Sequence, residues 1–266
     1  MEPKTIYYID ELNDEFSTAQ ITPRRIDGNY RYIRDGFLGR LAHILAYRVL
    51  AEPLGFLGMK LIYHHKIVNR RVLKQAGGQG YFLYGNHTNA GADPFVPSYV
   101  AFPKAPYVVV HPNNVSMPIV GPVMHYLGAL PLPDDKEAMR HFTEAMKLRI
   151  AQHKPVVIYP EAHIWPYYTD IRPFKDTSFH YPISLGVPVF CFTNTYQKKR
   201  LGFGPRMVTY VDGPFYPRTC KEDGSPMKPR EQRQELRDRV LETMRRRAQN
   251  NTVCKVKYIK KEQSHD

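Results

Sequence analysis

Six short apolar runs between residues 81 and 213 are the feature that most constrains how this chain can fold. Each run is rich in β-branched or aromatic residues and is bounded by Pro, Gly or Asn, a pattern typical of β-strands. The runs are YFLYG (81–85), YVVVH (107–111), ALPL (129–132), PVVIYP (155–160), PVFCFTN (188–194) and RMVTYVDG (206–213).

A helix is predicted between the third and fourth runs. The segment 134–154, DDKEAMRHFTEAMKLRIAQHK, carries apolar residues at helical spacing. We expect Asp134 to be its N-cap, Glu137 to complete a capping box, and Pro155 to block its continuation. Strand, helix and strand in this order predict an α/β fold, with a mixed, largely parallel sheet flanked by helices.

The chain length of 266 residues is compatible with one large domain. A hydrophobic content of 42% and a charged content of 24% are those of a globular protein. We expect a single domain with an N-terminal helical segment (1–75), an α/β core (76–215) and a basic C-terminal helix and tail (216–266).

The formal net charge is +13, which favours anionic partners. An anionic membrane surface, nucleic acid and phosphorylated small molecules all qualify on charge alone. Much of the excess lies in the basic stretch 228–261, which equally fits the solvated outer face of a helix. No nucleic-acid-binding module is recognisable in the sequence, so we do not expect nucleic acid as a partner.

The cysteines and histidines do not indicate a metal site. Cys191, Cys220 and Cys254 share no close spacing, and the histidines are scattered without an HExxH or HxH pattern. The first sixteen residues are acidic and lack the basic-then-apolar pattern of a secretory signal. We therefore expect no metal or bound cofactor, and a cytoplasmic location.

The segment 37–65 is apolar, but charged residues interrupt it about every eight positions. Each charge in a bilayer interior costs roughly 2.5 to 3.5 kcal/mol, so a membrane span is not expected. We expect Pro53 and Gly55 to divide the segment into two short helices. These helices either lie in the membrane interface at the inner face of the membrane or simply cover the core.

Polar residues with catalytic chemistry follow two of the predicted strands. Asn86 and His87 come directly after YFLYG, and Glu161 comes directly after PVVIYP. Strand ends at one edge of an α/β sheet are where sites gather. If Asp93 folds back on His87, the imidazole becomes a candidate general base. The alternative is a capped turn after a strand.

The blocks NHTNAGADPF and YPEAHIWPYYTDIRPFKD, followed by a strand with PV, resemble the glycerophospholipid acyltransferase family, which includes the lysophosphatidate acyltransferases. The similarity covers about residues 80–195. The family pattern begins with NH, four residues and Asp, and continues with a block similar to FPEGTRS and an FKxG element. The residues in matching places are Asn86, His87, Asp93, Pro160, Glu161, Phe174, Lys175, Pro188 and Val189.

The resemblance implies transfer of a fatty acyl group from acyl-CoA or acyl carrier protein to a hydroxyl of a lysophospholipid-like acceptor. His87 would be the general base and Asp93 its orienting partner. Backbone N–H groups after His87 are the expected donors to the oxyanion. The expected substrate-binding residues are Asn86, Glu161, His163, Arg172 and Lys175. Glu161 is expected either to orient the acceptor hydroxyl or to tie the two motif loops together.

The sequence also departs from the family pattern. Five residues, TNAGA, separate His87 from Asp93, and Ala162 stands where the family has glycine. Pro133 lies near the place of an arginine that the family uses for the acceptor phosphate. The acceptor therefore stays open between a lysophospholipid, a non-phosphorylated alcohol and an amine. A catalytically inactive membrane-binding homologue is a further alternative.

Overall fold

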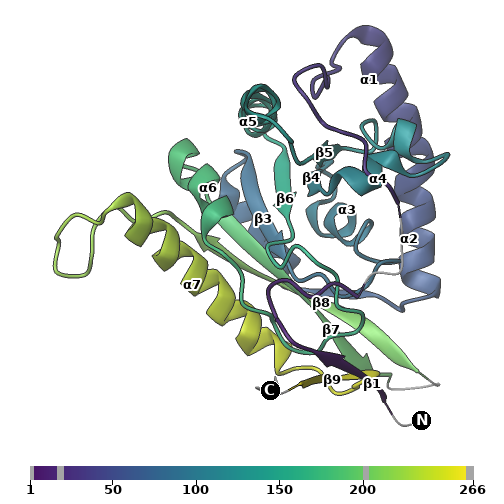
Figure 1. Ribbon diagram of the computed structural model, residues 1–266, viewed down its shortest axis with the longest axis vertical. Helices are drawn as coiled ribbons and strands as arrows, with labels where there is room; N and C mark the ends of the chain where they lie inside the picture. Colours follow the sequence, from purple (N-terminus) through teal and green to yellow (C-terminus); the bar gives the residue numbers. More distant parts are fainter. Residues whose placement is uncertain (1–2, 17–20, 200–203, 262–266) are drawn as a thin grey trace, which may run out of the picture.

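A twisted sheet runs through the centre of the computed structural model, which describes residues 3–16, 21–199 and 204–261 (Figure 1). Within these residues the sheet has seven strands in the order β2-β8-β7-β3-β6-β4-β5. β3, β4, β5, β6 and β7 are parallel to one another, and β8 is antiparallel to β7. The predicted mixed, largely parallel sheet is confirmed. The strands are β2 (Lys66–Val68), β3 (Tyr81–Gly85), β4 (Tyr107–Val110), β5 (Ala129–Pro131), β6 (Pro155–Ile158), β7 (Val189–Lys198) and β8 (Pro205–Phe215).

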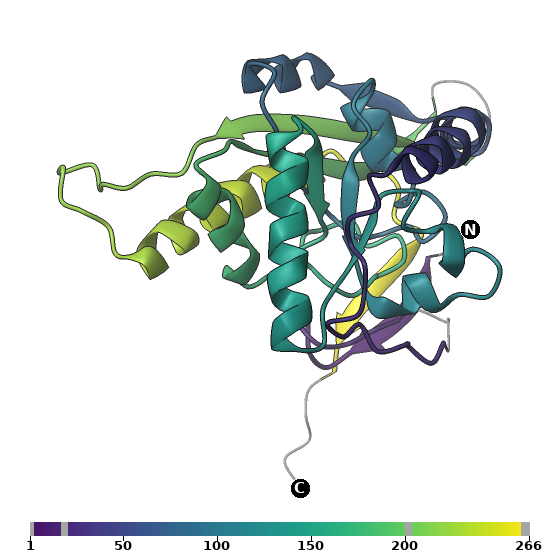
Figure 2. The same cartoon turned by 90° about the horizontal axis from the view of Figure 1, so that it is seen from above.

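Helices cover both faces of this sheet (Figures 1 and 2). One face carries α5 (Lys136–Ala151), α6 (His180–Leu185) and α7 (Pro229–Ala248), and the other carries α2 (Glu52–Leu61), α3 (Val96–Ala101) and the 3₁₀ helix η2 (Arg70–Ala76). β3 lies between these two layers and is buried along its whole length. Three further short helices are α4 (Pro112–Ser116), η3 (Gly121–Val123) and η4 (Thr177–Phe179).

A second, two-stranded parallel sheet joins the two end regions of the chain. β1 (Lys4–Tyr8) pairs with β9 (Val256–Lys260). Trp165 is fully buried beneath this pair, where its ring lies 4.8 Å from the Tyr258 ring and 4.8 Å from the Tyr8 ring. This small sheet therefore covers the loop that follows β6.

The basic helix near the C-terminus is α7. Leu236, Val240 and Met244 face the core, whereas Arg245 and Arg246 are exposed. Arg247 also makes a two-pronged ion pair with Asp212 on β8, at 2.8 and 2.6 Å. Much of the basic run is thus the solvated outer face of a packed helix, which was one of the two predicted alternatives.

The start of α5 differs from the prediction by one residue. Asp135, not Asp134, is the N-cap, and its side chain accepts a hydrogen bond of 2.8 Å from the Ala138 N–H. Asp134 instead accepts one of 2.6 Å from the backbone N–H of Ile26. The prediction of a capping box with Glu137 is therefore also wrong, because the N3 position shifts to Ala138.

Residues 37–61 of the segment 37–65 form one helical unit, not two short helices. α1 (Phe37–His43), the π-helix η1 (Ile44–Ala51) and α2 follow one another without a break. In the widened π turn the Glu52 N–H donates to the Tyr47 carbonyl, five residues back, so Pro53 enters without ending the helix. Gly55 is buried, and an added Cβ would lie 2.6 Å from Phe95, so glycine allows the helix to approach closely.

Candidate active site

The motif residues lie at the carboxyl edge of the central strands. β3 leads into Asn86 and His87, and its neighbour β6 leads toward Glu161. Asn86 is buried and holds the backbone of Asn194 on β7, accepting a hydrogen bond of 2.7 Å and donating one of 3.1 Å. This pairing fixes the direction in which the chain leaves β3. Asn86 is thereby engaged inside the fold, and the predicted substrate contact does not fit this burial.

The imidazole of His87 and the carboxylate of Asp93 share a hydrogen bond of 2.7 Å between Nδ1 and Oδ2. Asp93 is buried, whereas the His87 side chain keeps a quarter of its surface exposed. The same Asp93 oxygen accepts a second hydrogen bond of 2.9 Å from the Asn89 N–H. The predicted proximity of the two side chains is therefore present in the structure.

The longer TNAGA connection is accommodated by a turn stabilised by Asn89. Its side-chain Oδ1 accepts hydrogen bonds of 3.1 Å from the N–H groups of both Gly91 and Ala92. This side-chain-to-backbone turn takes up the additional residue and returns Asp93 to His87.

The environment of His87 sets its tautomer and its orientation. Because Asp93 accepts the proton on Nδ1, the lone pair lies on Nε2, the nitrogen that is available to a substrate. The ring also stacks on Tyr159, with 4.7 Å between ring centroids. Tyr159 in turn donates its hydroxyl to the Asp93 carbonyl at 2.6 Å. Sequence reasoning missed Tyr159, although its place at the end of the PVVIYP run was a usable signal.

Glu161 ties the two motif loops together. Its Oε2 accepts a hydrogen bond of 3.0 Å from the His87 N–H, and its Oε1 accepts one of 3.0 Å from the Arg172 N–H. The side chain is fully buried, and this burial raises the pKa of the Glu161 carboxyl while the nearby Arg172 lowers it. Of the two roles predicted for Glu161, the geometry fits the tie between loops.

Arg172 does not face a substrate. It is buried against the indole of Trp165 at 4.8 Å, lies 3.8 Å from the Glu161 carboxylate and donates to the carbonyls of Glu161 and His163. The same burial lowers the pKa of its guanidinium. The prediction that Arg172 receives an anionic headgroup is thus at odds with its position, because every face of the group is enclosed.

The other predicted substrate-binding residues are more accessible. Lys175 is exposed, and His163 lies 3.5 Å from the carboxylate of Glu15, in the N-terminal segment. Ala162 has a φ of +61°, the left-handed conformation that favours glycine. The glycine that the family has at this place thus suits the conformation of the backbone. Ala162 adopts the same conformation at a cost in backbone strain.

Most N–H groups of the loop after His87 are already used inside the loop. The Asn89 N–H donates to Asp93 Oδ2, and the Asp93 N–H donates to the Asn89 backbone carbonyl. The N–H groups of Gly91 and Ala92 both donate to the side-chain oxygen of Asn89. The expectation that this loop supplies donors to an oxyanion is therefore wrong for these four groups in the described conformation.

Fold and site together define an α/β protein with a histidine–carboxylate pair at the carboxyl edge of its sheet. Residues 64–193 match the sequence profile of the family described as Acyltransferase. The fold is similar to the crystal structure of the 1-acyl-sn-glycerophosphate (LPA) acyltransferase PlsC from Thermotoga maritima, with a TM-score of 0.52 and 16% identity. That alignment covers 79% of this chain and 86% of the other. A search of curated proteins by sequence gave no match.

The profile match spans 130 of the 266 residues and agrees with the family that the order of the motif blocks indicated. The likeness to PlsC, at this level of identity, establishes the shared fold.

Proposed function

We propose that this protein transfers a fatty acyl group from a thioester donor, acyl-CoA or acyl carrier protein, to a hydroxyl of a lysophospholipid-like acceptor. The observation that carries the proposal is the 2.7 Å hydrogen bond between His87 and the buried Asp93, beside a partly exposed imidazole. Acyl transfer to a hydroxyl needs a base with a pKa near neutrality, which imidazole supplies.

In the proposed reaction, His87 Nε2 takes the proton of the acceptor hydroxyl as its oxygen attacks the thioester carbonyl. Asp93, hydrogen-bonded at Nδ1, stabilises the imidazolium that forms. The tetrahedral intermediate then collapses, the C–S bond breaks, and the leaving thiolate takes the proton back from His87. The acceptor oxygen is itself the nucleophile, so no acyl-enzyme bond forms.

Two observations favour a second candidate acceptor. Pro133 stands near the place of the family's phosphate-binding arginine, and Arg172 is enclosed by Glu161 and Trp165. A non-phosphorylated alcohol or an amine is therefore the alternative acceptor for the same base and donor.

We further propose that the protein acts at the surface of an anionic membrane, on its cytoplasmic face. None of the helices within the described residues is long and apolar enough to cross a bilayer. The unit α1–η1–α2 instead exposes a stripe of large apolar side chains on one side of the molecule, including Leu50, Leu54 and Leu61, each more than half exposed. Such a stripe, combined with the net charge of +13, suits shallow insertion between anionic headgroups.

The function is tested by measuring thiol release from acyl-CoA with purified protein and a panel of acceptors. The panel contains lysophosphatidate, other lysophospholipids, monoacylglycerol, long-chain alcohols and amines. We expect release to depend on a lysophospholipid. Thiol release only with alcohols or amines would favour the second candidate acceptor. No thiol release with any donor, acyl carrier protein included, would contradict catalysis and indicate an inactive homologue.

A further inference from the structure

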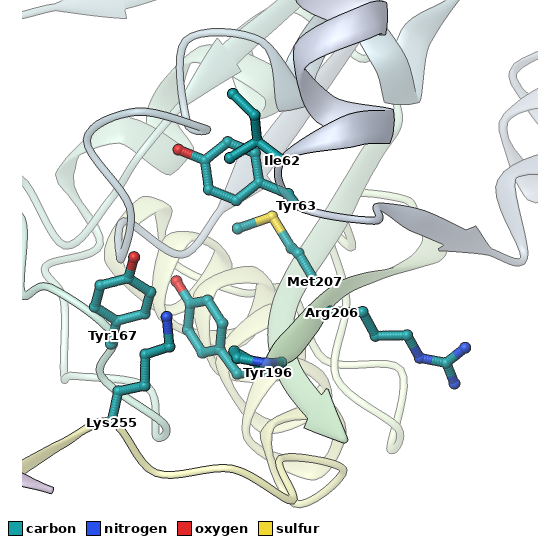
Figure 3. A pocket seen from close by; sticks show the side chains of 8 residues that line it. Ile62, Tyr63, Tyr167, Tyr196, Arg206, Met207 and Lys255 are labelled. Atoms are coloured by element: carbon teal, nitrogen blue, oxygen red, sulfur yellow. The ribbon is translucent and has the colours of Figure 1, made fainter. Parts of the chain in front are cut away.

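A small cavity lies beside the motif loop and includes residues outside the segment that matches the family. Its volume is about 110 Å³, and it is lined by Ile62, Tyr63, Tyr167, Tyr196, Pro205, Arg206, Met207 and Lys255. In Figure 3 the Lys255 side chain reaches up between the rings of Tyr167 and Tyr196, while that of Arg206 extends away. These described lining residues include two cations and no carboxylate.

Two residues of the cavity lining are hydrogen-bonded to Thr88, the residue that follows His87. The Tyr196 hydroxyl contacts the Thr88 hydroxyl at 2.9 Å and donates to the Thr88 carbonyl at 3.2 Å. The Tyr167 N–H donates to the same carbonyl at 2.8 Å.

The second contact between cavity and motif loop is at Gly91. A Cβ on Gly91 would lie 2.4 Å from the Tyr63 hydroxyl oxygen, so glycine permits that hydroxyl to approach the loop. Ile62, which also lines the cavity, is exposed next to the end of α2. The cavity therefore lies between the C-terminal end of α2 and the loop that carries the His87–Asp93 pair.

The chemistry of the lining suits an anion. The Lys255 ammonium lies 4.4 Å from the centre of the Tyr167 ring. The hydroxyls of Tyr63 and Tyr167 form no hydrogen bond with another described residue, so both remain available as donors. The volume of about 110 Å³ is far below the roughly 300–1,000 Å³ of sites for drug-sized ligands, which matches a compact charged group and excludes a nucleotide or an acyl chain.

We propose that this cavity binds a phosphate group carried by one of the two substrates, with Lys255 as the counter-charge and Tyr63 and Tyr167 as hydroxyl donors. The proposal rests on the proposed function and deepens it. It supplies a cation beside the motif loop, in a chain where Arg172 is enclosed and Pro133 stands near the place of the family's phosphate-binding arginine. The phosphate belongs either to the acceptor headgroup or to the donor.

The first test is binding, which does not depend on turnover. Titration calorimetry with glycerol 3-phosphate and with coenzyme A is run on the wild-type protein, Lys255→Gln, Tyr167→Phe and the control Lys257→Gln, an exposed lysine on β9. We expect Lys255→Gln to weaken binding of one probe about 10- to 100-fold and Tyr167→Phe about 2- to 10-fold. Lys255→Arg should restore much of the affinity, and Lys257→Gln should bind as the wild type does.

The second test assigns the phosphate to a substrate by steady-state kinetics. If the acceptor carries it, Lys255→Gln raises the KM for lysophosphatidate and leaves that for monoacylglycerol unchanged. If the donor carries it, the KM for acyl-CoA rises with either acceptor. Equal probe binding by the wild type and Lys255→Gln overturns the proposal. Because binding is measured without catalysis, that result is distinct from a failure to find acyl transfer.

Discussion

At the scale of residues, a chain of hydrogen bonds holds the carboxylate that orients His87. Asn194 Nδ2 lies 3.5 Å from Asp93 Oδ1, at the outer limit of a hydrogen bond, and Asn194 Oδ1 accepts from the Thr209 hydroxyl at 2.6 Å. Because Thr209 gives its only hydroxyl proton to Asn194, His65 Nε2 must be the donor in its 2.6 Å contact with Thr209. This leaves His65 Nδ1 as an acceptor.

His65 should make the stability of the protein depend on pH. Burial lowers the pKa of His65 from its ordinary 6.5 to about 4, and its Nδ1 is buried without a partner among the described residues. The folded state therefore binds this proton less tightly than the unfolded chain. The stability contribution is complete above pH 6.5 and is lost as the pH falls toward 4, with a slope of up to about 1.4 kcal/mol per pH unit.

Urea unfolding at several pH values checks this prediction. His65→Gln keeps a donor for Thr209 and should make the decline in the free energy of unfolding between pH 6.5 and 4 shallower, because His125, whose pKa is also lowered to about 4, still contributes. The exposed neighbour His64 provides the control, because His64→Asn should leave the decline unchanged. An identical pH dependence in the wild type and His65→Gln would show that His65 does not contribute to it.

At the scale of elements, Glu161 joins the loop after β3 to the loop after β6. Glu161→Gln replaces one acceptor oxygen by an NH₂ group that faces a backbone donor, and it leaves the Arg172 charge buried without its partner. Breaking a buried ion pair in this way costs about 3–5 kcal/mol. We expect a loss of that size in the free energy of unfolding, measured by urea denaturation.

The matched control is Glu144→Gln on α5, where Glu144 pairs with Arg140 at 3.3 Å on an exposed surface. Exposed pairs contribute about 1 kcal/mol or less. A similar loss for both variants would mean that Glu161 does not hold the two loops as described.

The exposed stripe of α1–η1–α2 makes a prediction about membranes. Replacing Leu50, Leu54 and Leu61 with Glu should lower binding to vesicles containing phosphatidylglycerol at least about tenfold, because each buried leucine contributes about 1.5–3 kcal/mol. Vesicle flotation measures the effect. Met139→Glu, at a partly exposed apolar site on α5, should bind as the wild type does. Undiminished flotation of the triple variant would exclude this stripe as the membrane contact.

At the scale of the whole molecule, the main sheet was largely predictable because strand signals are local. All six apolar runs are strands, and the order of motif blocks indicated the family whose profile matches residues 64–193. The N-cap of α5 was not predictable, because Asp134 is diverted by the N–H of Ile26, 108 positions away in the chain. A bond between distant segments leaves no periodic trace in the sequence.

The site divides in the same way. His87 and Asp93 are six positions apart, so their contact followed from a local motif. The enclosure of Arg172 depends on Trp165, Glu161 and the N-terminal segment together, and the cavity around Lys255 is assembled from segments far apart in the chain. Neither arrangement could be derived without the fold.

The central claim is that His87, oriented by Asp93, takes the proton of the acceptor. The most direct test measures kcat for acyl transfer to the best acceptor by the wild type, His87→Ala and Asp93→Asn, with circular dichroism to verify folding. The account predicts that kcat falls about 10²- to 10⁴-fold in both variants, the range for a positioned acid–base group. A folded His87→Ala protein with wild-type kcat would contradict it.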